Sequence, residues 1–170
     1  YERVEVSVDW HGIVKEKYKA VIDEADLPVL DRRCPMAIEE VLKQNKDASY
    51  VIPSIEPILI HCGIEISEHE ALKGKKKIIT TPCKSLAAHG NKLGLQDTYF
   101  VSWKEFLKTL DTKLTVKEKA LEESPIPLGY FSSLNVDTMS LTGKETIEEY
   151  FISDRHKDKD LIEMLYCEGG

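Results

Sequence analysis

The sequence contains no long apolar run. Its longest apolar stretches, such as residues 58–60 and 78–79, fall far below the roughly 18 residues needed to span a bilayer, so we expect no membrane segment. It also lacks a basic stripe, because its lysines and arginines are interleaved with acids and its net charge is −7. Binding through the release of phosphate counterions is therefore not favoured, and we expect no nucleic-acid partner.

A secretory signal is also missing from the sequence. The chain begins at Tyr1 rather than Met, and no basic segment followed by an apolar one comes after it. We therefore expect a segment of a longer product with a cytoplasmic location. Only four cysteines occur, without a C-x-x-C pair, so a disulfide framework is not favoured. Metal binding, catalysis and simple burial remain as alternatives for these thiols.

Strand and helix patterns alternate along the chain. Apolar periodicity, prolines and capping signals give the following expected elements. Strands are expected at residues 4–8, 28–30, 76–81, 99–101 and 161–166, a strand entry followed by a helix at 51–66, and helices at 14–25, 35–45, 86–93, 102–110, 117–123 and 144–151. The segment 124–142 reads as an extended, loop-rich connection.

This alternation predicts an α/β fold with a mainly parallel sheet flanked by helices. We expect one domain over residues 1–170, with two small lobes at 1–112 and 113–170 as the alternative. The mixture of 42% hydrophobic and 31% charged residues is ordinary for a globular chain of this length.

Three of the cysteines follow predicted strands. Cys34, Cys83 and Cys167 each come just after a strand, and the carboxyl ends of parallel strands share one edge of a sheet. Three converging thiolates suit an iron–sulfur cluster. Partly buried ordinary thiols and a zinc site are the alternatives. Cys62 lies within an apolar run, and we expect it to be a buried, inert thiol.

The motifs around these cysteines resemble those of a known family. LDRRCPMA at residues 30–37 is similar to the T-S-C-C-P signature of iron-only (FeFe) hydrogenases, and TTPCKSL at 80–86 is similar to M-P-C-x-x-K. IEMLYCEGG at 162–170 resembles E-x-M-x-C-x-G-G-C, and residues 127–129 resemble the P-L-G of an intervening loop. The motifs occur in the family's order, so the chain resembles the H-cluster domain of these enzymes.

The resemblance implies a 4Fe–4S cluster with Cys34, Cys83 and Cys167 as ligands. The family's fourth cysteine would fall one position after Gly170. In the family, that cysteine bridges the cluster to a di-iron subsite, where protons and electrons combine reversibly to hydrogen. The resemblance also implies a redox partner, either a separate redox protein or an adjoining ferredoxin-like domain.

Two departures from the family pattern bear on the chemistry. Arg33 stands where the family has a proton-relaying cysteine, and a guanidinium that stays charged is a poor relay. Leu86 stands where the family has a lysine that contacts the di-iron subsite, and a leucine cannot donate a hydrogen bond. We therefore assign no catalytic residue and do not expect an intact di-iron subsite.

Three hypotheses result. The first is a hydrogenase-like 4Fe–4S domain for redox transfer or sensing, with lost or altered hydrogen chemistry. The second is a divergent catalytic segment of an iron-only hydrogenase, in which another residue replaces the relay at Arg33. The third is a cluster-free interaction domain that retains the fold.

Two other features carry alternatives. Glu163 matches the glutamate of the third signature, and it either accepts N–H groups of the cluster loop or faces solvent. The basic run at residues 73–77 either docks an acidic electron donor or forms a solvated loop.

Overall fold

The chain divides into two compact units. The computed structural model describes residues 1–44, 49–110, 124–153 and 155–167. Unit 1 comprises Tyr1–Gly12 and Ile58–Glu122, and unit 2 comprises Ile13–Pro57 and Glu123–Gly170. Each unit is thus built from two separate segments of the chain, which differs from the continuous lobes 1–112 and 113–170 considered from the sequence.

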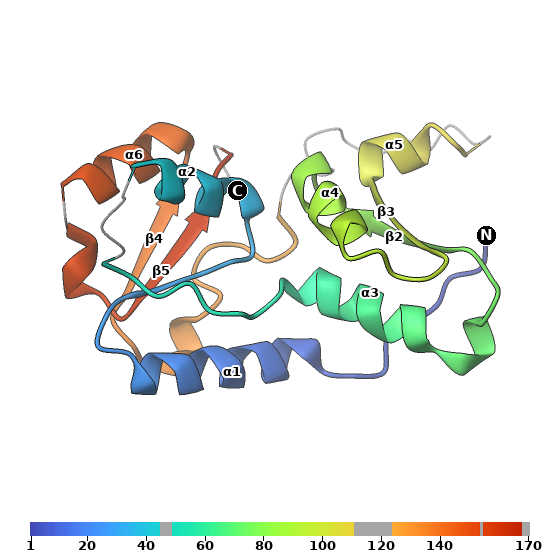
Figure 1. Cartoon of the computed structure of the whole chain (residues 1–170), viewed down its shortest axis with the longest axis horizontal. Helices are drawn as coiled ribbons and strands as arrows, with labels where there is room; N and C mark the ends of the chain where they lie inside the picture. Colours follow the sequence, from blue (N-terminus) through green and yellow to red (C-terminus); the bar gives the residue numbers. More distant parts are fainter. Residues whose placement is uncertain (45–48, 111–123, 154, 168–170) are drawn as a thin grey trace. The chain divides into compact units, whose positions relative to one another are not determined.

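Unit 2 contains a three-stranded parallel sheet. Its strands are β1 (Val29–Leu30), β4 (Thr138–Thr142) and β5 (Leu161–Leu165), in the order β1-β5-β4. Figure 1 shows β4 and β5 side by side. All five residues of the central strand β5 are buried, as expected for a parallel strand covered on both faces. Because β1 pairs with β5, residues 13–57 belong with the later part of the chain, and this pairing explains the discontinuous division.

Two helices pack beside each other against this sheet. They are α2 (Pro35–Gln44), which follows β1, and α6 (Lys144–Ile152), which follows β4. Proline suits the first turn of α2 because it lacks the N–H that would otherwise be left without an acceptor there. Gly143 precedes α6 with a φ of 86°, in the left-handed region that glycine adopts at little cost. The shared core contains the following buried side chains: Leu30, Val41, Ile147, Phe151, Ile162 and Met164.

Unit 1 contains a two-stranded parallel sheet. The strands β2 (Lys77–Thr81) and β3 (Thr98–Ser102) pair in register, with Ile79 opposite Phe100. Helix α4 (Lys84–Lys92) connects them, and α3 (Ile58–Glu68) packs against β2. The Phe100 ring contacts both helices and is 3% exposed. This ring is therefore a centre of the unit 1 core, together with Ile60, Leu86 and Ala87.

The remaining elements are short, apart from the first helix. Helix α1 (Trp10–Glu24) begins in unit 1 and continues into unit 2, while α5 (Trp103–Leu107) follows β3 directly. Ser102 caps α5, since its Oγ accepts the Glu105 N–H at 3.4 Å and donates to the Glu105 carboxylate at 3.0 Å. The described ranges also contain 3₁₀ turns at Glu70–Leu72, Ser132–Leu134 and Arg155–Asp158. In the described ranges, no helix combines the length and apolar character needed to cross a membrane.

The parallel α/β class predicted from the sequence is confirmed, but two expected elements are wrong. Residues 4–8 form no strand, since Val4 and Val6 are 42% and 40% exposed and the adjoining Ser7 is held by a side chain of α3 instead of a neighbouring strand. The expected loop at 124–142 contains β4, an edge strand whose only fully buried residue is Leu141. The serine and threonines of β4 do not give the apolar pattern of a buried strand, so the sequence did not indicate one. The predicted helix at 117–123 lies outside the described residues.

Candidate functional site

Cys34 and Cys83 occupy equivalent positions in the two units. Each cysteine follows a parallel strand and directly precedes the first residue of a helix. The Cys34 carbonyl accepts the Ile38 N–H at 3.3 Å, and the Cys83 carbonyl accepts the Ala87 N–H at 3.2 Å. Both cysteines are therefore N-cap residues, at the helix end whose free N–H groups and dipole favour negative charge.

The Cys83 thiol already uses one of these N–H groups. Its Sγ accepts the Leu86 backbone N–H at 3.4 Å, which is the capping contact of α4. The Leu86 side chain is 7% exposed and packs in the unit 1 core with Phe100. Leu86 therefore supplies a backbone donor to sulfur and an apolar side chain to the core.

Cys167 follows β5, the centre of the unit 2 sheet. It lies two residues after the strand and is exposed, and its carbonyl accepts the Thr142 hydroxyl at 2.9 Å. Because β1 and β5 are adjacent and parallel, Cys34 and Cys167 both follow strand ends on the same edge of that sheet. Cys83 has the corresponding place after β2 in unit 1. The predicted strand-end placement is therefore present for all three cysteines.

The structure does not gather these side chains into a finished metal site. Among the described residues, no three His, Cys, Asp or Glu side chains are grouped so that they could hold a metal ion. None of the four cysteines, which all lie in the described part of the chain, forms a disulfide. The donor chemistry fits an iron–sulfur cluster, since the candidate ligands are thiols at strand ends and one sulfur accepts a backbone N–H.

Cys62 differs from the other three cysteines. It lies inside α3 and is half-buried, not fully buried as expected. Burial raises the pKa of the Cys62 thiol, and the nearby Glu65 raises it further. A thiol that keeps its proton is a poor nucleophile and a poor metal ligand, which agrees with leaving it outside the ligand set.

Arg33 is the centre of a buried ion network in unit 2. Its Nε donates to the Asp31 carboxylate, and its Nη2 donates to Glu163 Oε1 at 2.9 Å. Its Nη1 donates to the carbonyl oxygens of Ile126 and Pro127, each at 3.0 Å. The side chain is 10% exposed. Every guanidinium nitrogen therefore has an acceptor, and Arg33 joins β1, β5 and the loop at residues 126–131.

Glu163 completes this network from the middle of β5. Its side chain is fully buried and accepts four hydrogen bonds. Besides the Arg33 bond, Oε1 accepts the Phe131 N–H at 3.1 Å, while Oε2 accepts the Gly129 N–H at 2.6 Å and the Ser140 hydroxyl at 2.8 Å. Of the two alternatives drawn from the sequence, the solvent-facing orientation is wrong. Glu163 instead holds the loop that contains the P-L-G resemblance.

The titratable groups around Arg33 shift one another's pKa values. Burial disfavours the charged guanidinium, but Asp31 and Glu163 outweigh this effect, and the pKa of Arg33 lies above its usual value. Burial raises the pKa of Asp31, while Arg33 opposes that rise. Burial, and secondarily Asp31, also raises the pKa of Tyr18, whose hydroxyl accepts the Arg32 N–H at 2.9 Å. Arg33 consequently stays protonated throughout the accessible pH range.

Sequence reasoning did not find this network as a unit. Arg33 and Glu163 are 130 residues apart, and Asp31 and Tyr18 carry no motif of their own. The only signal was a glutamate inside the apolar run of the predicted strand at 161–166. A charged residue in a strand buried on both faces requires a partner of opposite charge.

Comparisons with known proteins do not add to this description, because no family model, curated protein or solved structure matches the chain.

Proposed function

We propose that this chain is a hydrogenase-like domain that holds a 4Fe–4S cluster for electron transfer or sensing and does not turn over hydrogen in the ordinary way. The observation that carries the proposal is the repeated placement of thiols after parallel strands. Cys34 and Cys167 follow adjacent strands in unit 2, and Cys83 follows a strand in unit 1. The backbone N–H that reaches Cys83 Sγ supports it.

The proposed roles of the chain's own groups follow from their chemistry. The thiolates of Cys34, Cys83 and Cys167 would bind iron, and helix N-terminal N–H groups would offset their negative charge. The cluster itself would accept and release one electron. The fourth ligand is proposed to be a cysteine directly after Gly170 or a ligand from outside the chain. A redox protein or an adjoining ferredoxin-like domain is the proposed electron partner.

Arg33 supports the proposal that hydrogen chemistry is lost or altered. A relay group must bind and release a proton during each turnover, whereas Arg33 keeps its charge and donates to two carboxylates and two carbonyls. The divergent catalytic hypothesis therefore requires another residue as the relay. The buried Leu86 side chain also supports the loss of an intact di-iron subsite, because it offers no polar contact.

A cluster-free interaction domain is the second candidate. The observation in its favour is that, in the described ranges, no three potential ligand side chains form a metal-binding group. In this case the three cysteines would serve only as N-caps and loop residues. The fold and the Arg33 network would be the same under both hypotheses, so only metal binding separates them.

The test is anaerobic reconstitution with ferrous iron and sulfide, followed by iron and sulfide assays. It is done on the chain itself and on a variant with one cysteine added directly after Gly170. We expect roughly four irons per chain and the visible absorption of a 4Fe–4S cluster. The variants Cys34→Ala, Cys83→Ala and Cys167→Ala should each lower iron uptake, while Cys62→Ala is the matched control and should not.

Two outcomes would contradict the proposal. Absence of bound iron in both proteins would favour the cluster-free domain. Hydrogen evolution from a reduced viologen by the reconstituted, matured protein would favour the divergent enzyme. Circular dichroism on each variant separates loss of the cluster from loss of the fold.

A further inference from the structure

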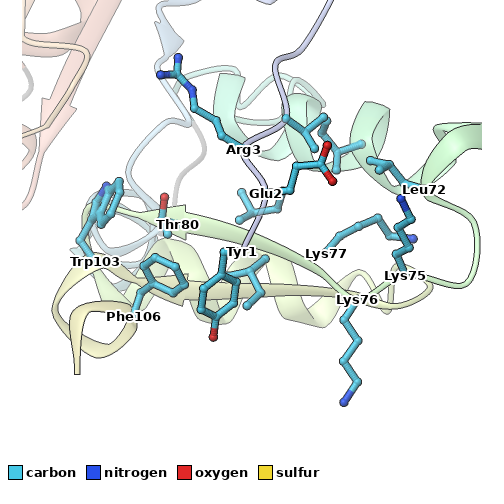
Figure 2. A pocket seen from close by; sticks show the side chains of 14 residues that line it. Tyr1, Glu2, Arg3, Leu72, Lys75, Lys76, Lys77, Thr80, Trp103 and Phe106 are labelled. Atoms are coloured by element: carbon cyan, nitrogen blue, oxygen red, sulfur yellow. The ribbon is translucent and has the colours of Figure 1, made fainter. Parts of the chain in front are cut away.

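A groove of about 660 Å³ lies in unit 1, apart from the cysteines. Its volume is in the range of binding pockets. The groove is lined by the N-terminal residues Tyr1 to Val4, by strand β2 and by side chains of α3 and α5. Figure 2 shows Trp103 and Phe106 near one end of this lining and Lys75, Lys77 and Leu72 near the other.

The groove follows an edge of the sheet, not one of its faces. Consecutive residues of β2, from Lys77 to Thr80, all line it, although successive side chains of a strand point to opposite faces. In the described part of the chain, β2 pairs only with β3. The other edge of β2 therefore presents backbone N–H and C=O groups toward the groove, and such an edge is a template for a further strand.

The lining of the groove carries more basic than acidic side chains, with Arg3, Lys75, Lys76 and Lys77 against Glu2. Lys77 is 6% exposed and its backbone N–H donates to the Asp97 carbonyl at 2.7 Å, while its Nζ forms no hydrogen bond or ion pair with the described residues. The exposed Lys75 lines the same end, and Figure 2 shows the side chains of Lys75 and Lys77 on one side of the strand, with Lys76 directed away. This local excess contrasts with the chain's net charge of −7 and favours an anionic partner.

The other end is aromatic. The Phe106 ring meets Tyr1 edge to face, with ring centres 5.2 Å apart, and meets Trp103 with ring centres 6.0 Å apart. Trp103 remains 39% exposed. These rings provide an apolar contact for a large side chain at the end of the groove away from Lys77.

We infer that this groove binds an extended acidic peptide segment of a partner protein, which adds to the free edge of β2 as a further strand. Backbone hydrogen bonds to β2 would give affinity, and side chains at alternate positions would give specificity. An acidic side chain would pair with Lys77 and Lys75. An apolar side chain would contact Trp103 and Phe106.

The length of β2 sets the length of the peptide. Five residues at about 3.3 Å each span roughly 16 Å, so five to seven peptide residues would cover both ends of the groove. This site is independent of the proposed cluster, because it uses none of the cysteines. Of the basic run at residues 73–77, Lys73, Lys75 and Lys76 are exposed before the strand, as in a solvated loop, whereas Lys77 is the buried first residue of β2.

The edge strand favours a peptide over a small anion. A small anion would neutralise Lys77 and Lys75 but would leave the β2 backbone groups without partners. The chain's own alternating segment at residues 4–8 is another possible strand, yet it lines the groove near its first residues without pairing with β2. These two occupants are outcomes that the experiment separates.

The probe is a fluorescein-labelled seven-residue peptide, Glu-Val-Glu-Phe-Glu-Val-Glu, titrated into the protein while fluorescence anisotropy is followed. We expect micromolar affinity that weakens as salt is raised. One control peptide carries Lys in place of every Glu, and a second carries N-methyl groups at alternate backbone positions. Both should bind at least about tenfold more weakly, because one loses the charge match and the other loses strand pairing.

Three variants test the residues. Lys77→Gln and Lys75→Glu should each weaken peptide binding about tenfold or more, and Trp103→Ala should weaken it through the apolar end. Lys92→Glu, on the exposed end of α4, is the matched charge control and should weaken binding only slightly. If Lys77→Gln fails to fold, as judged by circular dichroism, Lys75→Glu still decides the charge prediction.

Hydrogen exchange reports the mode of binding. Amides of β2 should gain protection when the peptide is bound. Failure of the acidic peptide to bind, equal binding of the N-methylated peptide, or equal weakening by Lys92→Glu would each overturn the inference. ATP serves as the small-anion probe, and the inference would also be overturned if ATP displaced the peptide and produced the same protection of β2. Protection of both residues 4–8 and β2 from exchange in the free protein would overturn it as well, because the chain's own segment would then occupy the edge.

Discussion

The ring of Phe100 lies against the backbone of Gly90, and no side chain fits between them. A Cβ atom on Gly90 would come within 2.5 to 2.6 Å of three atoms of that ring. Gly63 meets the same ring from α3, where a Cβ atom would lie 2.4 Å from Phe100 Cζ. Two glycines on different helices thus let one aromatic side chain bring α3 and α4 close to β3.

Gly90→Ala is therefore expected to destabilise unit 1. Alanine in place of glycine inside a helix normally stabilises by about 1 kcal/mol. Overpacking of a filled core costs about 1 to 3 kcal/mol, and the short contacts place this site toward the upper part of that range. We expect a net loss of about 1 to 2 kcal/mol, measured by urea unfolding.

The control for this prediction is the same substitution in a Phe100→Leu background. Without the ring, alanine at position 90 should be neutral or stabilising, so the double-mutant cycle should show strong coupling. Equal effects of Gly90→Ala in the two backgrounds would show that the ring is not the cause.

Glu163→Gln should destabilise unit 2. The substitution removes the charge that faces Arg33 in a buried site, where loss of one partner of an ion pair commonly costs about 3 to 5 kcal/mol. Glutamine keeps one acceptor oxygen for the loop N–H groups, so we expect a loss of about 2 to 4 kcal/mol in urea unfolding. The exposed Glu149→Gln on α6 is the control and should change stability by less than about 0.5 kcal/mol. Equal midpoints for the two variants would disprove the role given to Glu163.

The contact between Glu65 and the N-terminal segment should be lost in acid. Glu65 accepts the Ser7 N–H at 2.7 Å and the Trp10 indole N–H at 2.6 Å. These bonds favour the carboxylate and hold the pKa of Glu65 below its usual value of 4.5, with the Ser7 N–H as the largest cause. Because the folded-state pKa is lowered, the stabilisation is present above pH 4.5 and is lost as the pH falls through the lowered pKa.

Trp10 fluorescence measures this transition in a Trp103→Phe background, which leaves one tryptophan. We expect a change with its midpoint below pH 4.5. Glu65→Gln should remove the change, whereas Glu68→Gln, an exposed neighbour on the same helix, should keep it. A midpoint at or above pH 4.5 would contradict the lowered pKa.

Cysteine reactivity should separate Cys62 from Cys167. Burial raises the pKa of Cys62, so this thiol carries less thiolate than an ordinary cysteine, and its half-buried sulfur is less accessible than the exposed Cys167. With iodoacetamide near pH 8, we expect Cys167 to react at least about ten times faster, as followed by peptide mass spectrometry. In concentrated urea the two rates should become similar, and equal rates in the folded protein would rule out the difference.

The fold class was predictable because the strongest signals are local. The apolar runs of β2 and β5, the Ser102 cap and the proline at the start of α2 all lie within a few residues of the elements they specify. The elements that sequence reasoning missed depend on distant neighbours. Strand β4 is a strand because β5 lies beside it, and residues 4–8 alternate like a strand but have no strand partner in the described sheets.

The candidate site was predictable to a similar extent. The strand-end positions of Cys34, Cys83 and Cys167 followed from local patterns, and the structure has them as expected. Whether these cysteines bind a cluster remains a prediction. The commitment of Arg33 to Asp31 and Glu163 was not visible, because it depends on pairing between β1 and β5.

The order of the strands in unit 2 also has a consequence during synthesis. The ribosome completes β1, α2 and all of unit 1 before it makes β5, the central strand. Arg33 is made 130 residues before Glu163, a delay on the order of ten seconds at usual elongation rates. During that interval the nascent chain carries an arginine that lacks one of its two carboxylates and a β1 that lacks its neighbour β5. Unit 1, whose two strands are close in sequence, can fold first. Residues 13–57, the first segment of unit 2, meanwhile lack their partner strand and can be bound by chaperones.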